Sequence, residues 1–119
     1  MFNNLLKFED AIANLKEVLM VEKNEIVRDS AIKRFEICFD LAWKSIKLYA
    51  KSQGLECFSP RGCFKVAVQL KLIENDSLWV EMIEDRNIST HVYSEKMADD
   101  IYLKLDKYLN LFEKLKEKL

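Results

Sequence analysis

The chain has 119 residues, of which half are apolar and a third are charged, and its formal net charge is −1. This length suits one domain with a core of its own, and this composition excludes a disordered chain. The near-neutral charge gives no overall attraction to nucleic acid or to an anionic membrane. Two glycines and one proline disfavour a β fold, which needs many turns, and favour a few long helices.

The first predicted helix begins near Asn3 or Asn4, either of which can cap it, and runs to about Glu22. Its apolar residues recur three and four positions apart and form one stripe for a core. The second predicted helix covers about residues 25–52 and ends before Gly54. It carries two neighbouring apolar stripes, so it must be covered on two sides. It therefore lies either in the centre of a bundle or at a subunit interface.

Charged residues lie close to the stripes of the second helix, and Arg34 and Asp40 are candidates for buried or interfacial ion pairs. Ordinary surface pairs remain the alternative. A third helix is predicted from Pro60 to about Leu72, because Ser59 can cap it and proline at the first helical position loses no hydrogen bond.

A fourth helix is predicted to begin at residues 75–77 and to continue into a polar stretch that ends near Tyr93. A fifth begins near Ser94 and reaches the C-terminus, with one long apolar stripe that Tyr102 and Tyr108 flank. The sequence contains no repeat and no linker. We therefore predict one domain over residues 1–119, an all-α antiparallel up-and-down bundle of four or five helices.

The three cysteines, Cys38, Cys57 and Cys63, form no C-x-x-C pair, and the single histidine, His91, is distant in sequence. This pattern predicts neither disulfides nor a metal site, and we expect buried thiols that act as small apolar groups in a reducing cytoplasm. The chain has no apolar run long enough to cross a membrane and no signal-peptide pattern at its start.

The polar stretch from Asp85 to Tyr93 brings Arg86, Asn87 and His91 within a few residues of one another. Successive residues of a helix turn by about 100°, so in an unbroken helix Arg86 and His91 point roughly 140° apart. One chain therefore presents the two side chains poorly to a common target. Two chains related by a two-fold axis can bring the arginine of one chain to the histidine of the other.

Histidine and arginine without metal ligands suit the attack of an RNA 2′-hydroxyl on the neighbouring phosphate. The histidine moves the proton, and the arginine stabilises the charge that develops on the phosphate oxygens. Taken alone, a single histidine on an amphipathic helix is more often structural or simply exposed, so both interpretations stay open at this point. No glycine-rich phosphate loop, activated nucleophile or spaced carboxylate pair is present.

Several blocks of the chain resemble the small HEPN-domain proteins of the HepT-like kind, also described as nucleotidyltransferase substrate-binding proteins. The resemblance runs from about Arg28 to Tyr108. The matching blocks are Arg28-Asp29-Ser30, Arg34-Phe35-Glu36, Asp40-Leu41-Ala42-Trp43-Lys44, Ser59-Pro60-Arg61, Trp79, and Asp85-Arg86-Asn87 through His91 and Tyr93. The R-x4-H-x-Y pattern is loose by itself, but the upstream blocks in the same order make it fairly specific.

The resemblance implies an all-α bundle that dimerises and places the arginine and histidine of both chains in an interfacial cleft. It implies a metal-independent ribonuclease toxin without a cofactor, neutralised by a separate minimal nucleotidyltransferase that transfers AMP to the motif tyrosine. Carried onto this sequence, Arg86 and His91 are catalytic, Asn87 and Asp85 support them, and Tyr93 is the AMPylation site.

Two other interpretations are kept beside the toxin. The chain is a non-catalytic subunit that helps a nucleotidyltransferase to bind its substrate, or it is a helical interaction module whose motif is a relic. For the toxin, Arg61 and Lys65 on the basic third helix are candidate RNA-binding residues, because cationic side chains there can contact phosphates.

Overall fold

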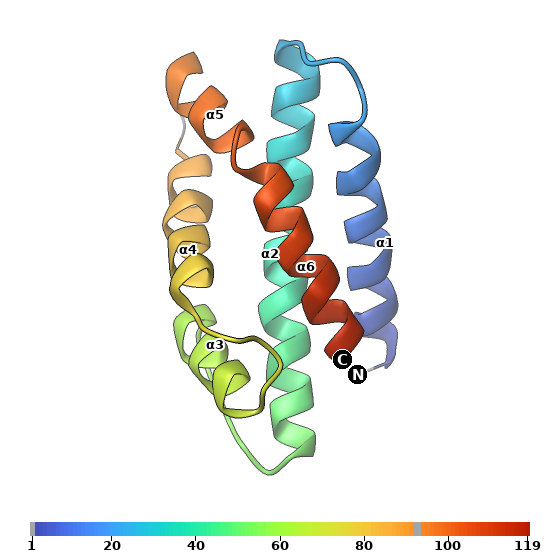
Figure 1. Ribbon diagram of the computed structural model, residues 1–119, viewed down its shortest axis with the longest axis vertical. Coiled ribbons are helices and arrows are strands. Elements are labelled where there is room, and N and C mark those ends of the chain that lie inside the picture. The colour runs from blue at the N-terminus through green and yellow to red at the C-terminus, as the bar shows by residue number, and fades with distance from the viewer. Residues whose placement is uncertain (1, 92–93) are drawn as a thin grey trace.

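The computed structural model describes residues 2–91 and 94–119. In these residues it has six helices and no strand, which confirms the predicted all-α class (Figure 1). The helices are α1 (Phe2–Leu19), α2 (Glu25–Ser52), α3 (Pro60–Gln69), α4 (Ser77–Ser89), α5 (Glu95–Tyr102) and α6 (Leu105–Lys118).

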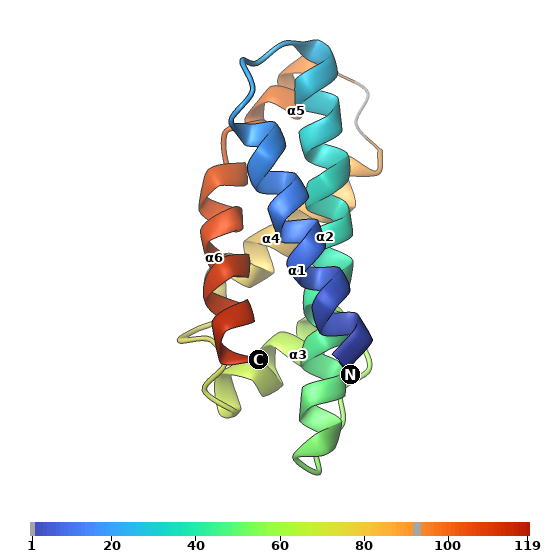
Figure 2. The same cartoon turned by 90° about the vertical axis from the view of Figure 1, so that its right-hand side faces the viewer.

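The long helix α2 is the centre of the bundle, and every other helix contacts it. Helix α1 runs along one side of α2, α4 lies on the other side, and α6 crosses α2 diagonally (Figure 1). Seen from the side, the bundle is elongated, and both chain ends lie toward the same end of it (Figure 2). Of the two expectations for α2, the structure shows the central position in the bundle.

The core is built around aromatic side chains that come from five helices. Phe64 of α3 lies 4.9 Å from Trp79 of α4 between ring centroids, and Trp79 lies 5.8 Å from Phe112 of α6. Phe35 of α2 stacks on the ring of Tyr108 at 5.4 Å, and Phe8 of α1 meets Phe112 edge-on. Each such ring contributes about 2 kcal/mol or more by leaving water, so this cluster fixes how α3, α4 and α6 sit on α2.

The first two helices differ slightly from the prediction. Helix α1 begins at Phe2 and ends at Leu19, so Asn3 and Asn4 lie inside the helix and do not cap it. The amide of Asn4 instead donates to the hydroxyl of Ser45 on α2, at 3.3 Å. Helix α2 covers the predicted residues, and the side chain of Asn24 caps it by accepting from the next turn of backbone at 2.8 Å.

Helix α3 begins as predicted, because the Ser59 hydroxyl accepts the Gly62 N–H at 3.1 Å. It ends at Gln69, earlier than predicted, because Lys71 adopts a left-handed conformation with φ of 61°. The Leu72 N–H then donates back to the Ala67 carbonyl at 2.9 Å, which closes the helix end.

The predicted fifth helix is two helices. Leu103 and Lys104 form a turn between α5 and α6, with the Lys104 N–H bonded three residues back to Ile101 at 2.9 Å. Tightening of this kind is common where a helix ends. The change of direction lets α6 bury its own stripe, including Leu105 and Tyr108, while Leu103 stays exposed.

Two of the three cysteines do not behave as predicted. Cys57 and Cys63 form a disulfide across the loop that leads into α3, with their Cα atoms 5.0 Å apart. The sequence interpretation missed it because it looked for C-x-x-C pairs, whereas the loop and the first turn of α3 bring together residues six positions apart. Cys38 is a buried free thiol, as expected. Among the described residues, no helix is long and apolar enough to span a membrane.

Candidate functional site

Arg86 lies on the last turns of α4, on the side that faces α2. Its side chain is 25% exposed, and its Nη2 atom lies 3.6 Å from the Asp40 Oδ2 atom of α2. Asp40 therefore forms an ion pair, as predicted, but a half-exposed one, since its side chain is 43% exposed. Arg34, the other predicted partner in an ion pair, donates instead to the backbone carbonyl of Asn14 on α1 at 2.6 Å.

A second polar contact fixes the same end of α4 to α2. The Ser89 hydroxyl donates to the Glu36 carboxylate at 2.6 Å. Together with the Arg86–Asp40 pair, it holds the last turn of α4 against one turn of α2. The Arg86 guanidinium has further N–H donors beyond the one nearest to Asp40, because the group carries five.

His91 follows directly after the end of α4. The helix ends at Ser89, and the His91 N–H donates to the Ile88 carbonyl at 2.9 Å, a bond over three residues. The predicted angle of roughly 140° between Arg86 and His91 assumed an unbroken helix, so it does not apply here. The imidazole is exposed at this end of α4. Tyr93, the predicted AMPylation site, lies outside the described residues.

Asn87 is exposed, and its backbone carbonyl accepts from the Thr90 hydroxyl at 2.8 Å, while its side-chain amide makes no hydrogen bond among the described residues. No described side chain therefore fixes the direction of its amide. The structure brings Asn87, Arg86 and His91 to one end of α4, as the sequence predicted, without a direct contact between their side chains.

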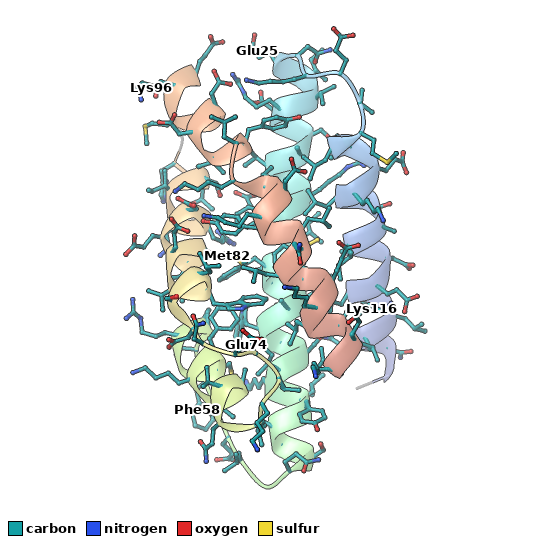
Figure 3. All side chains as sticks on the ribbon, viewed as in Figure 1. Glu25, Phe58, Glu74, Met82, Lys96 and Lys116 are labelled. Atoms are coloured by element: carbon teal, nitrogen blue, oxygen red, sulfur yellow. A yellow bond between two sulfur atoms is a disulfide. The ribbon has the colours of Figure 1, made fainter. Side chains whose placement is uncertain are left out.

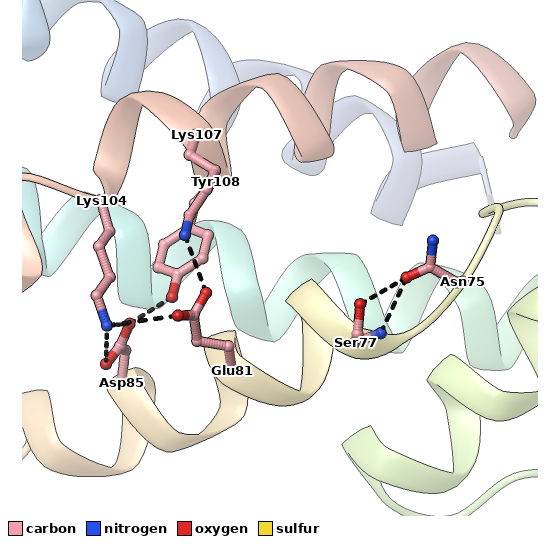
Figure 4. A network of polar contacts seen from close by, with 7 residues as sticks. All are labelled: Asn75, Ser77, Glu81, Asp85, Lys104, Lys107 and Tyr108. Atoms are coloured by element: carbon pink, nitrogen blue, oxygen red, sulfur yellow. Dashed lines mark hydrogen bonds and ion pairs between the residues drawn. The ribbon is translucent and has the colours of Figure 1, made fainter.

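Asp85 is buried, with 6% of its surface exposed, and it points toward α6 (Figure 4). Its carboxylate accepts a short hydrogen bond from the Tyr108 hydroxyl. It also accepts from the Lys104 ammonium, at 3.1 Å to Oδ2 and 3.4 Å to Oδ1. Asp85 therefore does not contact the predicted catalytic pair; it attaches the helix that carries the pair to α6.

The ionisation of this cluster reflects its surroundings. Burial, with the hydrogen bond and charge of Asp85, raises the pKa of Tyr108 well above its ordinary value. Burial by itself lowers the pKa of Lys104, but the bonds and charges of Asp85 and Glu81 outweigh this effect and raise it above its ordinary value. At neutral pH Tyr108 therefore keeps its phenol proton and Lys104 keeps its positive charge.

Glu81, one helical turn before Asp85, forms the outer and more exposed part of the same network. Its carboxylate lies 2.9 Å from the Lys107 ammonium and 3.7 Å from that of Lys104. The hydrogen bond from Lys107 and the nearby positive charges keep the pKa of Glu81 below its ordinary value.

At the start of α4, Asn75 accepts from both the N–H and the hydroxyl of Ser77, which fixes the first turn (Figure 4).

A cavity of about 400 Å³ lies between α2, the end of α4 and the start of α5, and Ser89 is part of its wall. Its charged lining consists of two cations and three carboxylates, from Arg28, Lys33, Asp29, Glu36 and Glu95. This mixed lining does not form a simple phosphate pocket. The described residues also contain no group of three or more side chains that could hold a metal ion.

The two candidate RNA-binding residues lie elsewhere. Arg61 and Lys65 are exposed on α3, which lies near the beginning of α4 in Figure 1, whereas Arg86 and His91 come at its other end. The structure therefore does not bring them next to the predicted catalytic residues within one chain. A second cavity, of about 450 Å³, lies between the α3–α4 connection and α6 and is lined by none of the predicted site residues.

Sequence reasoning missed Tyr108 and Lys104 as members of this region, because it treated Tyr108 only as a flank of an apolar stripe. A signal was present. On α4 the buried positions Trp79, Met82 and Asp85 follow one another at intervals of three, so a carboxylate occupies a place where an apolar residue is typical. A buried carboxylate requires hydrogen-bond donors, and those had to come from another helix.

Comparisons with known proteins bear on the family and the fold of this chain. A protein from Haemophilus influenzae named probable ribonuclease HepT is 27% identical over 93 residues, which are 71% of this chain and 64% of that protein's length. A crystal structure of a protein from Thermus thermophilus is 36% identical and superposes with a TM-score of 0.85, over 91% of this chain and 94% of that one.

The family model described as nucleotidyltransferase substrate binding protein like matches residues 3–119, nearly the whole chain. With the fold and the ordered motif blocks, this match confirms the HepT-like resemblance. The chain belongs to the family of proteins like the nucleotidyltransferase substrate-binding proteins.

Proposed function

We propose that this chain is a metal-independent ribonuclease that acts as a homodimer, with Arg86 and His91 as its catalytic residues. The observation that carries the proposal is the end of α4, where a partly exposed guanidinium held by Asp40 is followed closely by an exposed imidazole. The relative named probable ribonuclease HepT supports the same activity at the level of the family.

The two side chains have complementary tasks in this reaction. Neutral His91 accepts the proton of an RNA 2′-hydroxyl, and the 2′-oxygen attacks the adjacent phosphorus. The bond from phosphorus to the 5′-oxygen breaks, and that oxygen takes the proton back from the His91 imidazolium, directly or through water, so the products are a 2′,3′-cyclic phosphate and a 5′-hydroxyl. Arg86 stabilises the charge on the phosphate oxygens in the transition state. Asn87, exposed beside them, supports the contact with RNA.

A two-fold dimer completes the site in this proposal. Ile37 on α2 and Ile88 on α4 are 44% and 41% exposed, and they are the sequence neighbours of Glu36 and Ser89, which contact each other between the two helices. Burial of these apolar side chains against a second copy favours association of the two chains along this side of the bundle. Arg61 and Lys65, on the distant α3, then contact RNA away from the cleavage point.

The proposal includes regulation by a nucleotidyltransferase partner, which the family description supports. A separate minimal nucleotidyltransferase acts as the antitoxin and transfers AMP from ATP to the Tyr93 hydroxyl, releasing pyrophosphate. The added AMP is bulky and anionic, and it is attached two residues after His91 in the sequence, so it repels the RNA backbone and switches cleavage off. The chain works in the cytoplasm, where the RNA is. The sequence analysis used three free thiols as an argument for this location, and the disulfide between Cys57 and Cys63 removes that argument.

Cleavage of a mixed RNA by the purified protein in excess chelator tests the proposal. We expect 2′,3′-cyclic phosphate ends, and complete loss of cleavage in Arg86→Ala and His91→Ala. Arg34→Ala is the matched control, because its guanidinium donates to the Asn14 carbonyl of α1 and makes no polar contact with α4 among the described residues, and it should cut like the wild type. An inactive wild type at high concentration contradicts the proposal.

Mixing the two inactive variants tests the shared site. If each site takes its arginine from one chain and its histidine from the other, equal mixing gives heterodimers with one intact site, and about a quarter of the wild-type activity returns. If each site lies within one chain, no activity returns.

A second candidate function rests on the family description itself, which names substrate binding and not cleavage. In that function the chain is a non-catalytic subunit of a nucleotidyltransferase. It predicts an inactive wild type that still binds the transferase and lowers its KM. A gain in mass of one AMP after incubation with the transferase and ATP, abolished by Tyr93→Phe, shows that the chain is a substrate of the transferase in either case.

A further inference from the structure

Helix α4 lacks a continuous apolar stripe in the half that carries Arg86. The first half buries Trp79 and Met82, and Figure 3 shows Met82 between α4 and its neighbours α2 and α6. From Ile83 to Ser89, Asp85 is the single fully buried residue. Apolar packing therefore fixes the first half of the helix, and a carboxylate takes its place in the second half.

The contacts of this carboxylate are directional. Asp85 accepts from the Tyr108 hydroxyl and, at 3.1 Å, from the Lys104 ammonium, and both donors come from the α6 end of the chain (Figure 4). The Tyr108 ring is itself fixed by stacking on Phe35 at 5.4 Å. A hydrogen bond weakens steeply when its angle changes, whereas apolar contact tolerates sliding. This network therefore restricts rotation of α4 about its axis more closely than packing does.

Rotation of α4 decides where Arg86 points. Asp85 and Arg86 are consecutive residues, so their side chains leave the helix about 100° apart, one toward α6 and the other toward Asp40 on α2. At about 6 Å from the axis, a rotation of about 20° moves a guanidinium by about 2 Å. A displacement of about 1 Å can already lower a catalytic rate by about a hundredfold.

We propose that Tyr108 and Lys104 are positioning residues that act through Asp85 to set the rotation of α4, and thereby the direction of the Arg86 guanidinium. The catalytic consequence rests on the proposed ribonuclease function, but the positioning itself does not. It is a property of the fold that can be measured in the absence of RNA.

The decisive variant separates stability from positioning. Asp85→Leu combined with Tyr108→Phe replaces the buried polar contact by apolar groups of similar size, a change that is often neutral or stabilising. Tyr108→Phe alone is the second variant, because it keeps the ring on Phe35 and removes only the hydroxyl. Lys16→Met is the control, since it removes an exposed ion pair with Glu113 of α6 and leaves Asp85, Lys104 and Tyr108 untouched.

Three measurements apply to each variant. The first is thermal unfolding. The other two, made well below the melting temperature, are the kcat and KM of RNA cleavage and the Arg86 Nε–Hε cross-peak in nitrogen-15 NMR spectra. The cross-peak is assigned by its loss in Arg86→Lys. We expect the double variant to melt within a few degrees of the wild type, with a shifted cross-peak, a kcat at least tenfold lower and a nearly unchanged KM. Lys16→Met should match the wild type in all three.

A folded double variant with an unchanged cross-peak and an unchanged kcat overturns the proposal. If the double variant does not fold, Tyr108→Phe decides by the same criteria. A loss of activity that only follows the fraction of folded protein indicates a purely structural role and also overturns it. If the wild type does not cut RNA, the proposed ribonuclease fails, and the cross-peak alone decides whether Tyr108 and Lys104 position Arg86.

Discussion

The two halves of α4 are attached to the bundle by different kinds of contact. The first half is held by aromatic packing, with Trp79 buried between Phe64 and Phe112. The second half is held by polar contacts on two sides, through Asp85 to α6 and through Arg86 to α2. The first kind of contact supplies free energy and little direction, whereas the second supplies direction and little free energy.

This difference separates stability from function along one short helix. Buried rings tolerate small shifts of their neighbours, and they belong where the chain needs a stable core. The residues of the candidate site need a defined direction, which hydrogen bonds to fixed partners provide. We therefore expect substitutions in the first half to lower stability and substitutions in the second half to change activity more than stability.

Trp79→Ala should have the largest effect on stability, a loss of about 4 kcal/mol in the free energy of unfolding, because it leaves a large cavity in the aromatic cluster. Chemical denaturation followed by circular dichroism measures it. Glu84→Ala, in the second half of the same helix and exposed, is the control and should cost less than about 1 kcal/mol. Equal losses in the free energy of unfolding for the two variants would contradict the expectation that the first half of α4 contributes more to stability than the second half.

Removal of the disulfide should also weaken the packed half, because it closes the loop into α3, the helix that brings Phe64 to Trp79. For so short a loop, Cys57→Ser with Cys63→Ser should cost about 2 kcal/mol. Thiol titration gives an independent check. Without reductant, the unfolded protein should show one reactive thiol and, after reduction, three. Three reactive thiols before reduction would contradict the disulfide.

The thiol of Cys38 should not react with the thiol reagent while the protein is folded. Burial raises the pKa of its thiol to about 12, so almost no thiolate exists at about pH 8, and the buried sulfur is also sheltered from reagents. A fast reaction of the folded protein with a thiol reagent would show that the core around Cys38 opens readily.

High pH should lower the stability that the polar contacts of the second half of α4 provide. The folded-state pKa of Tyr108 is raised, so the unfolded chain loses this proton above about pH 10 while the folded chain keeps it. The contribution of the Tyr108 phenol to the free energy of unfolding is complete below about pH 10. It is lost as the pH rises, by up to about 1.4 kcal/mol per pH unit for one proton. Lys104, whose pKa is also raised, acts in the same direction.

Denaturation of the wild type and of Tyr108→Phe between about pH 9 and about pH 11.5 measures this contribution. The variant lacks the phenol, so its stability should fall less steeply with pH. Parallel curves would mean that Tyr108 ionises as easily in the folded chain as in the unfolded one.

The smallest effect is expected from Lys107→Met. Its contact with Glu81 at 2.9 Å lies at the exposed rim of the polar network, and such surface pairs contribute about 0.5 kcal/mol or less. The free energy of unfolding in low and high salt measures it. A loss above about 1 kcal/mol would mean that the outer rim, and not Asp85, attaches this half of α4.

Local signals in the sequence were sufficient for much of the fold. The extent of α2 and the start of α3 at Ser59-Pro60 follow from caps and breakers within a few residues, and both were predicted. The family was also recognisable, because its motif blocks are continuous stretches that keep their order. The end of α3 at Gln69 was not predicted, since a lysine in the left-handed conformation gives no signal of the kind that a glycine gives.

The sequence by itself determined the all-α class, the main helices and the residues that carry reactive groups, because periodicity, caps and motifs act over short distances. The tertiary structure decided how those residues are held. The contact of Asp85 with Tyr108 spans 23 residues and that of Ser89 with Glu36 spans 53, and no local pattern encodes such pairs. Only the packing of α2 and α6 against α4 lets Asp85 attach α4 to α6 and directs Arg86 toward Asp40.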